Sequence, residues 1–232
     1  MTEHMPEDFY RSYSSFKRYQ TPIIKMKHER WYDREFWVPA RCSSGLSVLE
    51  LGSGTGEFLA YLQRKGVSRL CGVEMDREAV AAMPPGLERF VYLGDIWTYL
   101  EQSSDERWDR VVMLDVLEHF SSGQAVRLLE HVKRILAPGG LVVVRVPNMG
   151  SPLGAIFQYG DLTHKAAYNA ASLEQLGLAV GFEVERFLPQ RRGTPVRRFC
   201  EDMFFALLSR ILTVSAAVWT ANIIVIYRAR GS

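Results

Sequence analysis

The stretch Leu49–Phe58, LELGSGTGEF, decides the fold, because it joins a short apolar run to a glycine-rich turn. Glycine occupies every second position from Gly52 to Gly56, and EFLAYLQRKG, which follows the loop, has the pattern of a helix. Glycines permit a tight turn and let a ligand approach the backbone. Glu50 stands two residues before the first glycine and would repel a phosphate there. This strand–loop–helix unit therefore suits a ligand that carries positive charge.

The composition is that of a globular protein. The chain has 232 residues, of which 47% are hydrophobic, and this length is enough for one large domain with a full core. The net charge of +2 supplies no global attraction to nucleic acid, so we expect no nucleic-acid partner. The chain holds three widely spaced cysteines without a CxxC pair, which indicates a reducing compartment. Because MTEHMPEDFY contains no apolar signal segment, we expect a cytoplasmic protein.

Short β-rich runs alternate with helical or loop segments along the chain. The runs cover residues 47–52, 69–75, 89–95, 110–117, 141–147, 182–189 and 222–229. This alternation predicts an α/β fold with a doubly wound, mostly parallel sheet of seven strands and helices on both faces. Ser121 with Gln124 predicts a capping box before AVRLLEHVKRIL, which should stop at Pro138, and Ser172 with Gln175 predicts a second box.

The two ends of the chain depart from this alternation. We expect residues 1–40 to be a helical N-terminal lid or extension, and residues 41–232 to be the main domain, with a C-terminal helix and strand pair in 175–232. The lid has aromatic side chains that would cover a cleft, among them Tyr10, Tyr13, Phe16, Tyr19, Trp31 and Tyr32. The apolar stretch 203–227 is interrupted by Arg210, so we read it as a helix to about Leu212 followed by a buried strand. Peripheral contact with the inner face of a membrane is the alternative.

Acidic residues stand at the ends of four successive predicted strands, namely Glu50, Glu74, Asp95 and Asp115. The carboxyl ends of parallel strands meet at one edge of the sheet, where open α/β folds bind ligands. A carboxylate at Glu74 can accept both hydroxyls of a ribose, and Asp95 can meet an adenine amino group. Each acid alone could be a helix N-cap, but four in register indicate a ligand site.

These motifs carry a family resemblance. LELGSGTGEF, GVEMD, GDIW, LDVLEHF and LAPGGLVVVRVPN resemble the class I S-adenosylmethionine-dependent methyltransferases, over residues 46 to 228. The resemblance implies a Rossmann-like methyltransferase fold whose last strand is antiparallel, with S-adenosylmethionine as cofactor. It places Glu50 at the amino acid end of the cofactor, Glu74 at the ribose and Asp95 at the adenine, with Met75 and Ile96 flanking the ring. The implied cofactor-binding residues are Glu50, Gly52, Ser53, Gly54, Thr55, Gly56, Glu74, Met75, Asp95, Ile96, Asp115 and Val116.

The proton of a hydroxyl acceptor must be removed, and a histidine has the best-matched pKa. His164 lies in YGDLTHKAAYN, on the loop expected to cover the acceptor, and Asp161 could orient its ring. His119 follows the fourth strand and is a second catalytic candidate, although a packing role suits it as well. The sequence lacks HExxH, and adjacent Glu118 and His119 should point apart, so we expect no metal.

The acceptor is less well defined than the cofactor. The D-x-T-H run resembles methyltransferases of surface polysaccharide biosynthesis, which favours O-methylation of a sugar hydroxyl on a glycan, nucleotide-sugar or lipid-linked glycan. Tyr159, Asn148, Arg191, Arg192 and Arg197 are the candidate substrate-binding residues, since arginines suit phosphate and carboxylate groups. A quinone or other small aromatic acceptor and a non-catalytic cofactor-binding module are the alternatives. The sequence does not predict an oligomeric state.

Overall fold

A computed structural model describes residue 9 and residues 13–231 of the protein. These residues form an α/β fold around one seven-stranded sheet. The strands are β1 (Val48–Leu51), β2 (Leu70–Glu74), β3 (Val91–Leu93), β4 (Trp108–Leu114), β5 (Leu136–Pro147), β6 (Phe182–Pro189) and β7 (Asn222–Ala229). Their order is β3-β2-β1-β4-β5-β7-β6. The pairs among β1 to β5 are parallel, whereas β7 runs antiparallel to both neighbours. The predicted seven strands and the antiparallel last strand are confirmed.

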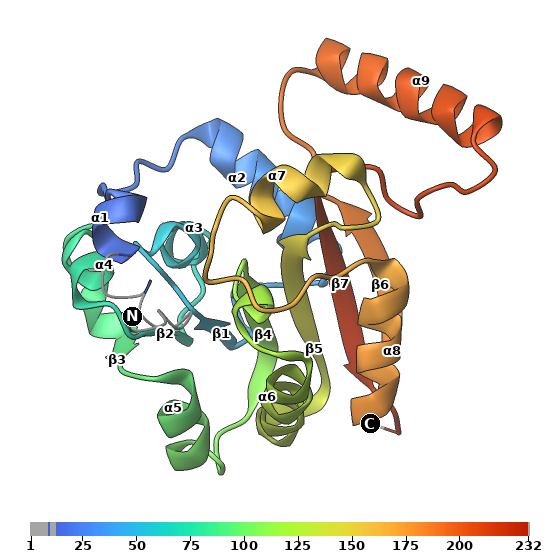
Figure 1. The fold of residues 1–232 in the computed structure, drawn as a ribbon. Helices are drawn as coiled ribbons and strands as arrows, with labels where there is room; N and C mark the ends of the chain where they lie inside the picture. The colour runs from blue at the N-terminus through green and yellow to red at the C-terminus, as the bar shows by residue number, and fades with distance from the viewer. Residues whose placement is uncertain (1–8, 10–12, 232) are drawn as a thin grey trace, which may run out of the picture.

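Helices cover both faces of this sheet (Figure 1). They are α1 (Tyr13–Lys17), α2 (Met26–Tyr32), α3 (Glu57–Arg64), α4 (Arg77–Ala81), α5 (Ile96–Gln102), α6 (Ser122–Ile135), α7 (Ala155–Gln158), α8 (Ala170–Val180) and α9 (Pro195–Ile211). A π-helical turn at Asp33–Trp37 continues α2, and 3-10 turns lie at Glu88–Phe90, Leu117–His119 and Pro152–Gly154. One apolar core lies between the sheet and α5, α6 and α8, and the other joins the opposite face to α2, its π-helical continuation and α3.

The N-terminal segment is only partly separate from the domain. Phe36 and Ala40 are buried in the second core, so the end of predicted region 1–40 packs as part of the main fold. The earlier helix α1 instead lies at the carboxyl edge of the sheet, near the segment that follows β5 (Figure 1). Residues 1–8 and 10–12 of the predicted lid, including Tyr10, lie outside the described residues.

Two helix boundaries differ from prediction. The capping box at Ser121 and Gln124 is present, but α6 ends at Ile135, and Pro138 already lies within β5. The predicted box at Ser172 and Gln175 is wrong. The cap of α8 is Asn169, whose side chain accepts from the Ser172 amide while the Ser172 hydroxyl accepts from the Asn169 amide. Asparagine caps as well as serine does, so the pattern was placed three residues too late.

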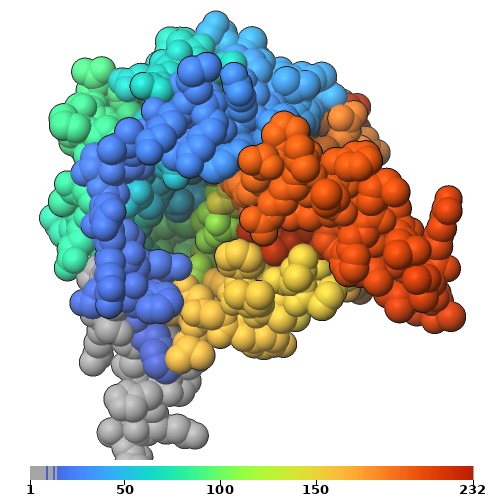
Figure 2. Space-filling model, turned by 90° about the horizontal axis from the view of Figure 1, so that it is seen from above, coloured from blue at the N-terminus to red at the C-terminus, as the bar shows by residue number. Residues whose placement is uncertain are grey.

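The carboxyl edge of the sheet is hollowed. Figure 2, seen from this edge, shows a hollow bordered by the N-terminal segment in blue, the segment after β5 in yellow and α9 in orange, with green residues at its floor. The helix α9 contains no buried residue, and it stands away from the body of the domain (Figure 1). Among the described helices, none is long and apolar enough to cross a membrane.

Candidate functional site at the carboxyl edge

The glycine loop packs tightly on one side and is open on the other. Gly52 has a φ of 75°, and a Cβ built there would lie 2.5 Å from Cγ2 of Val116, so a side chain at this position would be both strained and obstructed. Gly54 also has positive φ, but a Cβ built there would meet no atom within 4 Å. The loop is therefore anchored on the turn after β4 and exposes its backbone at Gly54.

Glu74 reaches back to this open part of the loop. Its Oε2 accepts from the Gly54 amide at 2.7 Å, and its Oε1 accepts from the Asp76 amide at 2.9 Å. Burial raises the pKa of Glu74, although these backbone amides act against the rise. The carboxylate thus stands at the end of β2, as predicted, and the two amides fix its orientation.

Glu50 is buried beneath the loop with an unsatisfied oxygen. Its side chain is 3% exposed, and its Oε2 has no hydrogen-bond partner among the residues that the structure describes. Burial raises the pKa of Glu50 well above its usual value, and the nearby Arg145 only partly offsets this effect. A cation bound above the loop would satisfy the orphaned oxygen and stabilise the carboxylate.

The other two strand-end acids already have structural partners. Asp95 caps α5, and its Oδ1 accepts from the amides of Trp97 and Thr98 at 2.8 and 3.2 Å. Asp115 has a φ of 60° and forms a two-bond ion pair with Arg145, at 2.9 and 2.5 Å. The structure places both acids at the predicted edge, where Asp95 has the N-cap role that was the alternative to ligand binding, while Asp115 is paired with Arg145 and caps no helix.

The expected S-adenosylmethionine fits this set of residues. The buried, unpartnered oxygen of Glu50 suits its ammonium group, the open backbone at Gly54 leaves room for its body, and Glu74 is placed to meet its ribose. The exposed side chain of Met75 is available to one face of an adenine ring.

Two histidines lie together on the acceptor side of the same edge. His119 ends the 3-10 turn after β4, and its ring centroid lies 4.7 Å from that of His164 in an edge-to-face contact. His119 is held by a chain of hydrogen bonds, because Thr163 Oγ1 lies 2.9 Å from its Nδ1 and donates to Asp161 Oδ1 at 2.6 Å. A hydroxyl has one proton, so Nδ1 of a neutral His119 is the protonated nitrogen that donates to Thr163.

The predicted pairing of Asp161 with His164 is not what the structure shows. Nδ1 of His164 faces the carbonyl oxygen of Gln158 at 3.0 Å, whereas Asp161 acts on His119 through Thr163. Burial lowers the pKa of both histidines, and together with the neighbouring His164 it lowers the pKa of His119 to about 4. Both rings are therefore harder to protonate than an exposed histidine.

The N-terminal segment contributes to this half of the site. Tyr13 donates to Asp161 Oδ2 at 3.0 Å, and the Lys17 ammonium lies 3.0 Å from the same oxygen. Burial alone would raise the pKa of Asp161, but the hydrogen bonds from Thr163 and Lys17 outweigh it and hold the pKa well below the usual range. Tyr19 also donates to Asp76, just after β2, at 2.9 Å. The described part of the predicted lid thus bridges the cofactor and acceptor sides.

The predicted substrate-binding residues are scattered. Asn148 is buried and serves the fold, because its side chain binds the carbonyls of Val218 and Thr220 and the amide of Gly150. Tyr159 directly follows α7, and its side chain is 73% exposed. Each of the three arginines has its own carboxylate, in the pairs Arg191–Asp202, Arg192–Glu35 and Arg197–Glu201. They do not present a shared, uncompensated anion site.

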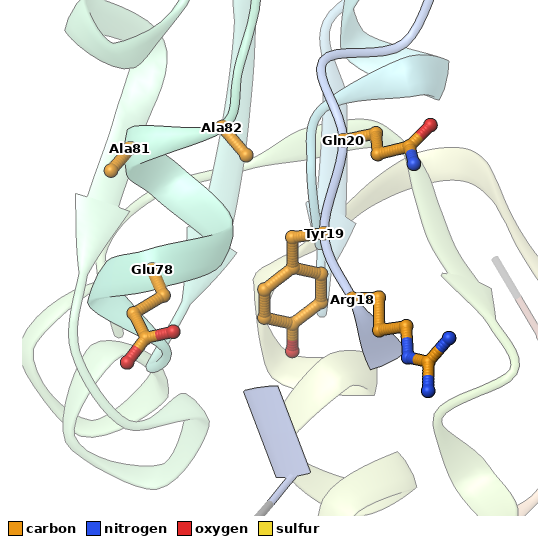
Figure 3. A pocket seen from close by; sticks show the side chains of 6 residues that line it. All are labelled: Arg18, Tyr19, Gln20, Glu78, Ala81 and Ala82. Carbon is orange, nitrogen blue, oxygen red and sulfur yellow. The ribbon is translucent and has the colours of Figure 1, made fainter. Parts of the chain in front are cut away.

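A separate cavity of about 540 Å³ lies beside the cofactor half of the site, which is the half formed by Glu50, the glycine loop and Glu74. It is lined by Arg18, Tyr19 and Gln20 of the N-terminal segment and by Glu78, Ala81 and Ala82 of the α4 region, and the Tyr19 ring stands between the two segments (Figure 3). None of the predicted cofactor residues lines this cavity, so it marks the seam between the lid and α4.

The sequence reasoning missed Glu118, Thr163 and Arg145 as members of the site. Glu118 was considered only as the neighbour of His119 and was expected to point away from it. In the structure, ligand atoms of Glu118, His119 and His164 all lie within 4.8 Å of one another. The geometrical reason for expecting no metal is therefore wrong, while the expectation itself stays a prediction. The signal available in the sequence was the acid-histidine pair directly after a strand end.

Comparisons with known proteins agree with this geometry. The model of a family described as a methyltransferase domain matches residues 25–186. A probable S-adenosylmethionine-dependent methyltransferase of Mycolicibacterium smegmatis is 31% identical over 165 residues, which are 68% of this chain and 59% of that protein. The mitochondrial ubiquinone biosynthesis O-methyltransferase of Dictyostelium discoideum is 22% identical over 145 residues, 56% of this chain and 43% of that protein. This chain thus spans about half of the length of these curated relatives.

A solved structure supports the fold. The crystal structure of a SAM-dependent methyltransferase from Archaeoglobus fulgidus superimposes with a TM-score of 0.67, covering 95% of this chain and 99% of that chain at 19% identity. At this identity the likeness speaks for the architecture alone.

Proposed function

Because this chain belongs to the methyltransferase domain family, whose cofactor is S-adenosylmethionine, we propose that it transfers the cofactor's methyl group to a hydroxyl oxygen. The acceptor we propose is a sugar hydroxyl on a glycan, nucleotide-sugar or lipid-linked glycan. The observation that favours a hydroxyl acceptor is a pair of half-buried histidines in edge-to-face contact after β4, with His119 held by Thr163 and Asp161. A sulfur or carboxylate acceptor would have less need of such groups.

Different residues would bind the cofactor and the acceptor. The bound cofactor supplies a methyl group on a positively charged sulfur, which needs alignment more than activation. Glu50 and Glu74 would hold the ammonium group and the ribose, and the turn after β4 would set the distance between the two halves. The acceptor hydroxyl would approach from the hollow beside the histidines and lose its proton there. The lid would exclude water through the contacts of Tyr13 and Lys17 with Asp161.

The surface of α9 supports an acceptor carried by a lipid. Its exposed side chains form an apolar stripe with a spacing of three to four residues, consisting of Val196, Phe199, Met203, Phe204, Leu207 and Ile211. Five arginines and two acids lie between residues 191 and 214. An apolar face with a basic surround suits an anionic membrane surface. We therefore propose that α9 docks on such a surface and brings the hollow to a lipid-linked glycan.

A quinone or another aromatic phenol is the second candidate. The Dictyostelium relative is named for ubiquinone biosynthesis, and the exposed Ile156, Phe157 and Tyr159 of the α7 region would suit an apolar acceptor as well.

The test uses S-adenosylmethionine labelled in its methyl group, with separate nucleotide-sugar, lipid-linked glycan and quinol acceptors. We expect the label to enter the lipid-linked glycan as a base-stable methyl ether on a sugar oxygen. Label in the quinol alone would support the second candidate. Absence of transfer to every acceptor, in protein shown by calorimetry to bind the cofactor, would favour the non-catalytic alternative.

A further inference from the structure

Glu118 is the feature of the acceptor half that the proposed reaction does not explain. Its side chain is 0% exposed, and neither carboxylate oxygen has a hydrogen-bond partner among the described residues. A buried carboxylate in this condition is costly, whether ionised or protonated, because even the protonated form needs an acceptor for its O–H. Something that binds both oxygens would remove this cost.

The charges around Glu118 are already paired among themselves. Asp115 is bound by Arg145, and Asp161 is bound by Lys17. The cationic side chains that face this part of the site are therefore engaged with other acids. Unlike Asp115 and Asp161, the carboxylate of Glu118 accepts no hydrogen bond from any residue in the described part of the chain.

Each of the two histidines has one ring nitrogen held by a neighbour, as histidines that bind a metal do. Nδ1 of His164 faces the Gln158 carbonyl, and Nδ1 of His119 faces the Thr163 hydroxyl, which in turn donates to Asp161. In metal sites the second ring nitrogen of a ligating histidine is held in this way by a carbonyl or by a carboxylate. Nε2 is then the nitrogen of the His164 ring that can take a metal, and it lies 4.0 Å from Glu118 Oε1, while His119 offers one of its ring nitrogens to the same group.

From these observations we propose that Glu118, His119 and His164 bind one divalent transition-metal ion. Two atoms that are each about 2.1 Å from one ion lie at most about 4.2 Å apart, so the 4.0 Å pair is within this limit and would draw closer around an ion. The whole group, within 4.8 Å, needs only small side-chain movements. Two imidazoles and one carboxylate favour zinc, cobalt, iron or manganese over magnesium and calcium, which prefer oxygen ligands.

The ion would change how the hydroxyl is activated, and this consequence rests on the proposed function. An acceptor oxygen bound to the ion has a lowered pKa and gives its proton to water. The oxygen then bonds to the methyl carbon as the carbon–sulfur bond breaks, and the cofactor leaves as a neutral thioether. The three side chains would hold the ion, the ion would hold the acceptor oxygen, and no side chain would need to take up the proton.

Binding is tested with the full chain, freed of metal by chelator and dialysis. Co²⁺ is titrated while its visible absorption is followed, and Zn²⁺ is titrated by calorimetry. We expect one ion per chain, with affinity weakened about tenfold or more in Glu118→Gln and in His164→Ala. His131→Ala is the matched control, because His131 lies on α6 against Trp97 and outside the cluster of Glu118, His119 and His164. This variant should bind the ion as the wild type does.

The outcomes separate this inference from the proposed function. Absence of Co²⁺ and Zn²⁺ binding by the wild type, or equal binding by the wild type and both cluster variants, overturns the metal site. Two variants are used so that failure of one to fold does not decide the result. If metal-free protein methylates a hydroxyl at the full rate, the metal has no part in the reaction, while the proposed function stands. If the ion binds as expected but no hydroxyl is methylated, the site stands and the proposed function fails.

Discussion

The two halves of the carboxyl edge are built in different ways. In the cofactor half, Glu50 and Glu74 lie at the ends of the adjacent strands β1 and β2, Gly54 lies in the loop after β1, and the bond from Gly54 to Glu74 spans 20 residues. In the acceptor half, Tyr13 bonds to Asp161 across 148 residues, and Thr163 meets His119 across 44. The first half is fixed by strand order and local turns, whereas the second is assembled by tertiary contacts. The acceptor half should therefore govern turnover, and the cofactor half should govern cofactor affinity.

The largest expected effect is a loss of turnover when a histidine of the acceptor half is replaced. His119→Ala and His164→Ala should each lower turnover by about a hundredfold or more, the range for loss of a group that activates the acceptor. Cofactor affinity, measured by calorimetry, should stay close to that of the wild type, because neither ring belongs to the cofactor half. His131→Ala is the control and should retain full turnover. Full turnover in His119→Ala or in His164→Ala would show that the replaced histidine has only a packing role.

The cofactor half should respond in the opposite way. Glu74→Ala removes the carboxylate expected at the ribose, at a cost of roughly 1.5–3 kcal/mol, which is about tenfold to a hundredfold in affinity. Turnover at saturating cofactor should change less than affinity does. Glu78→Ala, an exposed acid on α4, is the control. A dissociation constant for S-adenosylmethionine that is the same in Glu74→Ala and in the wild type would remove Glu74 from the site.

This contrast also explains what could be predicted from the sequence. The strands and the place of Glu74 follow from periodicity and from the glycine loop, which are local signals, whereas the antiparallel last strand was implied by the family resemblance. Asp161 was expected to orient His164, but in the structure it acts on His119 through Thr163, because the path of the loop after α7 is set by packing. The burial of Glu118 likewise depends on segments that return from elsewhere in the chain, such as Lys165 and Ala166, whose amides bond to its carbonyl. Spacing in the sequence does not encode such contacts.

A third prediction concerns the exposed stripe of α9, which belongs to neither half. Leu207→Glu should weaken binding to vesicles that contain anionic phospholipid by about tenfold or more, because burial of a leucine side chain is worth about 1.5–3 kcal/mol. Co-sedimentation measures the binding, and raised salt should weaken it further. Leu178→Glu changes an exposed leucine on α8 and should have no such effect. Equal sedimentation of the wild type and Leu207→Glu would exclude this face as the docking surface.

The smallest expected effect concerns Glu50 and the pH dependence of stability. Burial raises its folded-state pKa above the usual 4.5, so between 4.5 and the raised value the folded protein keeps a proton that the unfolded chain releases. The unfolded state then binds fewer protons, and the free energy of unfolding falls as pH rises, by at most about 1.4 kcal/mol per pH unit for one group. Glu50→Gln cannot titrate, so its stability should fall less steeply above pH 4.5 when both proteins are unfolded by urea at several pH values without cofactor. Saturating S-adenosylmethionine should flatten the wild-type slope, because its ammonium favours the ionised carboxylate. Parallel pH profiles for the two proteins would mean that Glu50 is ionised in the fold, and that the cation meant to satisfy it has to be sought elsewhere.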